Sequence, residues 1–193
     1  TSSSNASKTA LKNVKVYADQ KYINVLVEYD DEQITDKSSA PFHMYINTDN
    51  SAATGGYGEQ WSDADIDIML EGFVFENNQS VSYNPMIFQW TGTVGGNEWS
   101  WGEETATGSP IGLSQMIGNK IEIQIVREYI PVTWNESGFT IGFDIQQTWN
   151  SVGILPNATS GGKANKLPVV IDWENHADQP SQPENPTVET TVT

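Results

Sequence analysis

The stretch KIEIQIV, residues 120–126, decides the fold class. Its three isoleucines alternate with polar residues, so they share one face of an extended chain. Comparable stretches rich in Val, Ile and aromatic residues recur between clusters of Gly, Asn, Asp and Pro. They are residues 13–18, 22–29, 42–47, 65–75, 80–90, 97–101, 138–146 and 169–173. This pattern predicts an all-β fold, an antiparallel two-sheet β-sandwich of the jelly-roll type.

One domain accounts for most of the chain. Its 193 residues can bury a hydrophobic core without disulfides, and the sequence contains no cysteine. We expect a flexible linker over 1–8, the β-sandwich over 9–175 and a Pro/Glu/Thr-rich tail over 176–193. Only 113–117 (LSQMI) suggests a helical turn. No apolar run approaches the roughly 18 residues of a membrane span, and the Ser-rich start fits a mature protein whose export signal or lipid anchor was removed.

The charge is distributed unevenly. The chain has 25 acidic and 9 basic residues, a formal charge of −16, which argues against binding to nucleic acids or anionic membranes. Between Ser38 and Asn119 there is no Lys or Arg. The acidic residues in this stretch are Asp49, Glu59, Asp63, Asp65, Asp67, Glu71, Glu76, Glu98, Glu103 and Glu104. They form either a solvated surface or a set of cation ligands, because calcium binds oxygen donors almost exclusively.

Several of these acids lie in one loop and the strand after it, within YINTDNSAATGGYGEQWSDADIDIMLE at residues 45–71. Alternation places Asp65, Asp67 and Glu71 on one face of the strand. The opposite face then carries Ile66, Ile68 and Leu70. Neighbouring carboxylates repel one another unless they are solvated, protonated or neutralised by a metal. We predict a structural calcium ion with the ligands Asp49, Asn50, Asp63 and Asp65.

Two alternatives for these acids stay open. One is an ordinary solvated strand face. The other is catalysis by paired carboxylates, with Asp67 and Glu71 hydrolysing a glycosidic bond. The segment DIDIMLE resembles the signature of the family 16 glycoside hydrolases, which places Glu, Asp and Glu along one strand. It departs from that signature because an Asp stands where the nucleophilic Glu would be, and the last Glu lies one or two residues too far along.

Seven tryptophans are the other informative feature. Trp99 and Trp101 share a face if their segment is extended, and Glu103 follows them. Trp61 lies in a polar loop, GEQWSDAD, with little apolar sequence around it. Aromatic rings stack on the apolar faces of sugars, while carboxylates and amides bind the hydroxyl groups. The predicted sugar-binding residues are Trp61, Trp99, Trp101 and Glu103, whereas Trp149 and Trp173 are assigned mainly to the core.

The order of these motifs resembles the family-9-like carbohydrate-binding modules and the related DOMON-type domains. The matching motifs are INTDNSAATGG, SDADIDIMLEG, KIEIQIVREYI and FTIGFDIQ, over roughly residues 15–150. The resemblance implies a jelly-roll sandwich outside the cytoplasm, often with bound calcium, that holds sugar between aromatic rings. Asp49, Asn50 and Asp65 fall where the family has its acidic loop and following strand. The sequence departs at residues 126–128 (VRE), where many members have a Pro-initiated turn.

The combined prediction is a non-catalytic extracellular or cell-surface domain that binds a polysaccharide or oligosaccharide and carries a structural calcium ion. The composition and polar linkers also resemble Bacteroidetes surface lipoproteins that capture glycans. Three alternatives remain. They are a glycoside hydrolase using Asp67 and Glu71, a structural or adhesive surface module that binds protein, and a haem- or redox-binding DOMON-type domain with Met and His as axial ligands. His43, which lies between Phe42 and Met44, is expected to be structural.

Overall fold

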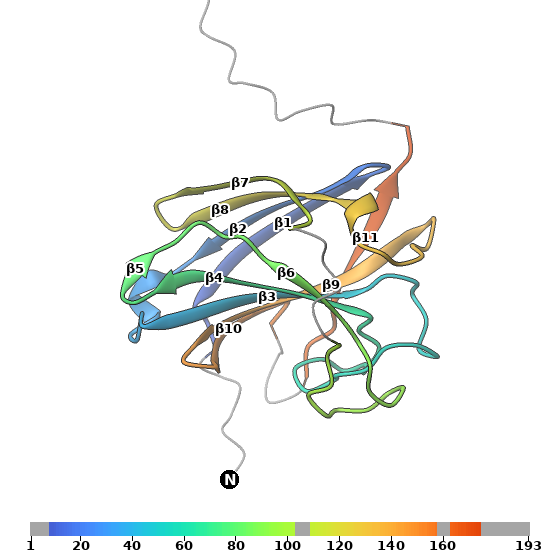
Figure 1. Cartoon of the computed structure of the whole chain (residues 1–193), viewed down its shortest axis with the longest axis horizontal. Coiled ribbons are helices and arrows are strands. Elements are labelled where there is room, and N and C mark those ends of the chain that lie inside the picture. The colour runs from blue at the N-terminus through green and yellow to red at the C-terminus, as the bar shows by residue number, and fades with distance from the viewer. Residues whose placement is uncertain (1–7, 103–108, 158–162, 175–193) are drawn as a thin grey trace, which may run out of the picture.

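The computed structural model describes residues 8–102, 109–157 and 163–174, which form eleven strands and two short 3-10 helices (Figure 1). The strands are β1 (Leu11–Asp19), β2 (Tyr22–Tyr29), β3 (Ser39–Asn47), β4 (Ile68–Glu76), β5 (Gln79–Ser80), β6 (Met86–Gln89), β7 (Ile111–Ile117), β8 (Lys120–Val126), β9 (Gly138–Gln147), β10 (Asn150–Leu155) and β11 (Leu167–Asp172). The helices are η2 (Asp31–Gln33) and η3 (Arg127–Tyr129). Neither of these described helices is long and apolar enough to cross a membrane. The predicted tail, and all but one residue of the predicted linker, lie outside the described residues.

The strands form one curled, mixed sheet. Along its main path the order is β5-β4-β3-β9-β11-β1-β2-β8-β7, with β10 beside β9 and β6 beside β4. The β1–β11 pair is parallel, and the other pairs are antiparallel. In Figure 1 the half of the sheet with β1, β2, β8 and β7 lies above the half with β3, β4 and β9. The all-β prediction is confirmed. A division into two separate antiparallel sheets is not, because β11 pairs with both β9 and β1.

The main hydrophobic core lies between the facing halves of the sheet. From one half, Ile121, Ile123 and Ile125 of β8 are all buried, as the alternation in KIEIQIV predicts. From the other half, Phe42 of β3 and Phe143 of β9 stack with their ring centroids 6.3 Å apart. All five side chains belong to one cluster. Burial of such apolar surface is the main term that stabilises the fold.

Two local predictions are wrong. Residues 113–117, expected as a helical turn, are part of strand β7, because this segment pairs with β8. The acidic strand begins at Ile68, later than the predicted start at Asp65. Ile66 packs in a different cluster from Ile68, so the two side chains do not share a face and the alternation breaks at Asp67.

Strand β3 is buried on both of its faces. Its inner side chains, such as Phe42 and Ile46, join the main core, whereas Tyr45 on the outer face joins a second apolar cluster. The members of this second cluster are Tyr45, Tyr57, Trp61, Ile66, Met69, Ile154 and Ala164, with Phe88, Trp90 and Trp101 packed against them. Much of it comes from the loops that precede β4 and follow β6. These loops therefore cover part of the outer face of β3, β4 and β9.

Because one face of β8 is buried and the other is exposed, substitutions on the two faces should have different effects on stability. Replacing Ile123 by Ala removes a buried side chain from the main core, so we expect the free energy of unfolding to fall by about 2–5 kcal/mol. The matched control is Glu122→Ala, whose side chain is exposed on the other face of the same strand. This control should stay within about 0.5 kcal/mol of the wild type. Urea unfolding measures both, and equal losses at the two positions would contradict the assignment.

Candidate functional site

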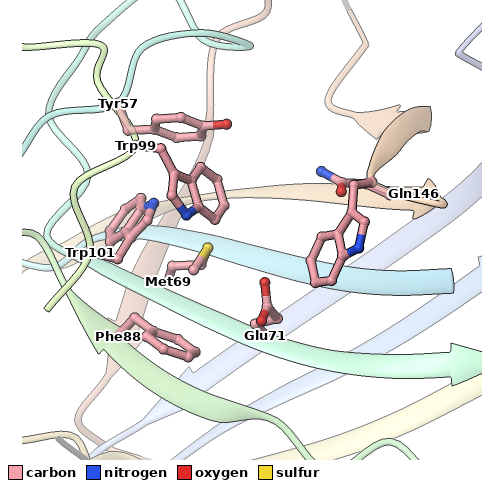
Figure 2. A pocket seen from close by; sticks show the side chains of 8 residues that line it. Tyr57, Met69, Glu71, Phe88, Trp99, Trp101 and Gln146 are labelled. Atoms are coloured by element: carbon pink, nitrogen blue, oxygen red, sulfur yellow. The ribbon is translucent and has the colours of Figure 1, made fainter. Parts of the chain in front are cut away.

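A cleft lies on the outer face of the β4-β3-β9 part of the sheet, beside the second cluster (Figure 2). Its volume is about 440 Å³, which falls in the range of small-ligand sites. The residues that line it are Tyr57, Met69, Glu71, Phe88, Trp99, Trp101, Gln146 and Trp149. Met69 and Glu71 come from β4, Phe88 from β6 and Gln146 from β9, while the remaining four come from loops and turns. The lining is thus mostly aromatic, with two polar side chains.

One wall of the cleft is built from aromatic rings that support one another. The ring of Trp99 packs edge-on against Tyr57, with centroids 5.1 Å apart, and against Trp101, with centroids 6.0 Å apart. Trp101 packs in turn on Trp90 at 5.2 Å, and these two residues also form a backbone bridge. Trp99 is nevertheless 54% exposed. Figure 2 shows Trp99, Tyr57 and Trp101 grouped on one side of the cleft. They form a preformed aromatic platform with an accessible ring.

Trp149 lines the cleft from the turn that joins β9 to β10. Thr148 and Trp149 both have positive φ angles, 44° and 67°. These angles suit a two-residue hairpin turn but disfavour β-branched and bulky residues. The indole ring packs edge-on against Phe73 at 6.0 Å and is still 57% exposed. The assignment of Trp149 to the core is therefore wrong, and its strained backbone is of the kind that clusters at ligand-binding sites.

A carboxylate held by a buried histidine forms the polar floor. Glu71 on β4 and His43 on β3 are cross-strand neighbours, and His43 Nε2 lies 2.6 Å from Glu71 Oε2. On its other side the imidazole Nδ1 lies 3.2 Å from the hydroxyl of Tyr45. His43 is fully buried, so these two contacts fix its ring. Within the described residues, Glu71 Oε1 makes no hydrogen bond and is left for a ligand.

Asp144 extends this polar row across the sheet. It lies on β9, opposite His43 in the register of β3 and β9. Its buried carboxylate accepts hydrogen bonds from Gln146 Nε2 at 2.8 Å and from Ser151 Oγ at 2.5 Å. Burial raises the pKa of Asp144, and the nearby His43 opposes that rise. Because the amide nitrogen of Gln146 is engaged by Asp144, its amide oxygen can accept a hydrogen bond from a ligand.

The predicted sugar-binding residues meet three different outcomes. Trp99 and Trp101 both line the cleft. Trp61 is fully buried, so the prediction of an exposed platform at this position is wrong. Its indole lies over Gly142 of β9, where any side chain would collide with the ring. A tryptophan in a polar loop is buried here because the loop covers the outer face of the sheet. Glu103 lies outside the described residues.

Two of the predicted calcium ligands contact a lysine. The Asp65 carboxylate forms an ion pair with Lys166, with Nζ and Oδ1 2.5 Å apart, and both side chains are largely buried. Asp65 also accepts a hydrogen bond from Asn47 Nδ2 at 2.7 Å. The same lysine Nζ lies 3.3 Å from the main-chain oxygen of Asp63. Lys166 therefore supplies a positive charge where the sequence predicts a metal ion.

The other two predicted ligands, Asp49 and Asn50, stabilise the loop itself. The Asp49 carboxylate accepts hydrogen bonds from the amide of Ser51 and the hydroxyl of Thr54. Asn50 donates to the main-chain oxygen of Gly138 at 2.8 Å. Within the described ranges, no group of three or more Asp, Glu and His side chains is placed to hold a metal ion. These side chains as arranged do not fit the predicted calcium site, and calcium binding stays a prediction from the sequence.

The alternative catalytic and haem-binding residues are also placed by the structure. Glu71 lines the cleft, whereas Asp67 is not among the described lining residues. The Asp67 carboxylate accepts hydrogen bonds from the amide and hydroxyl of Thr48 at 2.8 and 3.1 Å. Burial raises the pKa of Asp67, and the bonds from Thr48 oppose that rise. Both ring nitrogens of His43 have protein partners, as expected for a structural histidine, and His176 lies outside the described residues.

Comparisons of the chain with protein-family models, with curated proteins and with solved structures find no match.

The Lys166–Asp65 ion pair makes a prediction about stability and calcium. Because the lysine already neutralises Asp65, chelation with EDTA should leave the melting temperature unchanged. Lys166→Met leaves a largely buried carboxylate without its cation, and we expect the free energy of unfolding to fall by about 3–5 kcal/mol. Adding Asp65→Asn to this variant should restore most of the loss. A lower melting temperature after chelation of the wild type would contradict this account and support a bound metal.

Proposed function

We propose that the protein is a non-catalytic carbohydrate-binding domain and that the saccharide binds in the cleft, against Trp99 and Trp149. What supports this most directly is the exposure of these two indole rings, both more than half accessible, on a cleft that also presents Glu71 and Gln146. Aromatic side chains around a few convergent polar groups are typical of small-molecule sites. Exposed aromatic clusters on a soluble domain mark interaction surfaces.

The chemistry of the cleft suits a polyhydroxylated ring. A pyranose has an apolar C–H face that can stack on an indole, and a rim of hydroxyl groups that need hydrogen-bond partners. Here Glu71 Oε1 and the amide oxygen of Gln146 would accept hydrogen bonds from hydroxyl donors. Both side chains are held in place before binding, Glu71 by His43 and Gln146 by Asp144. Preorganisation of this kind lowers the entropic cost of binding.

The same lining argues for binding without hydrolysis. Most glycoside hydrolases use a pair of carboxyl groups that flank the scissile bond. Among the described lining residues, Glu71 is the one carboxylate, and one of its oxygens is engaged by His43. Asp144 is buried and accepts hydrogen bonds from Gln146 and Ser151. The described groups therefore suit recognition of a sugar better than cleavage of its linkages.

The fold type, the location and the binding partner are proposed from the sequence motifs. Their resemblance to carbohydrate-binding modules supports a jelly-roll sandwich, an extracellular or cell-surface location and a polysaccharide or oligosaccharide partner. The curled sheet, with one face in the core and the other bearing the cleft, is compatible with such a module.

Single substitutions in the cleft test the proposed function. Trp99→Ala and Trp149→Ala each remove an accessible ring, and we expect each to weaken saccharide binding at least tenfold, about 1.4 kcal/mol. A panel of soluble neutral oligosaccharides, first on a glycan array and then by titration calorimetry, would provide the ligand and its affinity.

The matched control is Tyr129→Ala, which removes an aromatic side chain of similar exposure, 57%, that does not line the cleft. Its affinity should equal that of the wild type. The proposal fails if the folded protein binds no saccharide, or if Tyr129→Ala and the two cleft variants lose affinity equally.

A further inference from the structure

The polar row beneath the cleft holds two carboxyl groups and one imidazole. Glu71, His43 and Asp144 lie side by side on β4, β3 and β9. The two carboxyl groups flank the imidazole, so acidic groups outnumber basic ones in this row.

The basic side chains near the second cluster make their contacts outside the cleft. Lys166 forms its ion pair with Asp65, and Lys163 Nζ donates to the main-chain oxygen of Gly58 at 2.5 Å. Lys8 Nζ donates to the side chain of Gln60 at 3.2 Å, and its charge also acts on Asp144 at one end of the row. None of these lysines is among the described residues that line the cleft. The protein's formal charge of −16 adds to the negative field that an approaching ligand meets.

The aromatic lining also favours a positive charge. The faces of Trp and Tyr rings attract ammonium groups through their quadrupoles, by about 0.5–2 kcal/mol depending on how far the site is desolvated. Tyr57, Trp99, Trp101 and Trp149 all contribute to this cleft. In Figure 2 the Glu71 carboxylate lies between the labelled aromatic side chains on one side and Gln146 on the other. An ammonium group bound there would meet a carboxylate and aromatic rings together.

We infer that the cleft selects saccharides that carry a protonated amine, such as oligomers of glucosamine, over neutral and acidic ones. This inference rests on the proposed carbohydrate-binding function and names its substrate class. An ammonium group in place of a hydroxyl would add an ionic attraction to the hydrogen bond with the Glu71 carboxylate at Oε1. A uronate or sulfated sugar would place an anion beside Glu71, with no basic side chain in the described lining to offset the repulsion.

Titration calorimetry with three oligosaccharides of equal length tests the inference. They are a glucosamine oligomer, the same oligomer N-acetylated, and a glucose oligomer with the same linkage, all at a pH where the free amine is protonated. We expect the glucosamine oligomer to bind at least tenfold more tightly than the other two. Added salt should reduce this preference, because screening weakens the ionic part of the interaction. The salt series uses the wild-type protein and does not depend on any variant folding.

The Glu71→Gln variant removes the charge and retains a hydrogen-bond acceptor. It should weaken binding of the glucosamine oligomer at least fivefold more than binding of the glucose oligomer. The control is Glu122→Gln, which changes the net charge by the same amount on β8, outside the cleft, and should keep the preference. If the neutral oligomers bind as tightly as the glucosamine oligomer, the inference is overturned while carbohydrate binding stands. If the folded wild type binds none of the three, nor any saccharide on the array, both are overturned.

Discussion

Strand β3 is buried on both faces, and this double burial determines how the rest of the molecule is arranged. Its inner face is covered by the opposite half of the curled sheet, and its outer face by loops. A polar residue on such a strand must find partners within the protein, since an unpaired buried polar group is costly. His43 satisfies this requirement through Glu71 and Tyr45, whereas Asn47 satisfies it in part, because its Nδ2 donates to Asp65 and its Oδ1 has no hydrogen-bond partner among the described residues. The acidic residues around β3 are therefore placed by the pairing needs of this strand.

The cleft follows from the way the outer face is covered. The loop before β4 brings Trp61 over Gly142, a position where the absence of a side chain lets the indole lie directly on the sheet. The segment after β6 adds Trp101 and Trp99, and these rings line the cleft together with Glu71 and Gln146. Aromatic rings thus border Glu71 and Gln146, which contact the protein through His43 and Asp144 and face the cleft. That combination is the basis of the proposed saccharide site.

The sequence predicts the strands much better than it predicts which loops and side chains cover the outer face of the sheet. The alternation in residues 120–126 identifies both a strand and its buried face, because burial on one side imposes a period of two. The sequence predicts the wrong environments for Trp61 and Trp149 because exposure depends on contacts between distant segments. Trp61 is buried through Gly142, about 80 residues away, and Trp149 is exposed by a turn with positive φ angles and no Gly or Asn-Gly signal. The calcium prediction rests on the number of acidic residues, whereas the position of Lys166 beside Asp65 depends on a contact between segments about 100 residues apart.

We propose that a saccharide occupies this cleft and no other surface. The seven indole N–H groups provide separate reporters in a ¹H–¹⁵N correlation spectrum, because the tryptophans occur in distinct environments. Titration with a bound oligosaccharide should shift the indole signals of Trp99, Trp101 and Trp149. The signals of Trp134 and Trp173, which pack around Arg127, should stay in place. Shifts confined to Trp134 and Trp173 would place the ligand elsewhere and contradict the account.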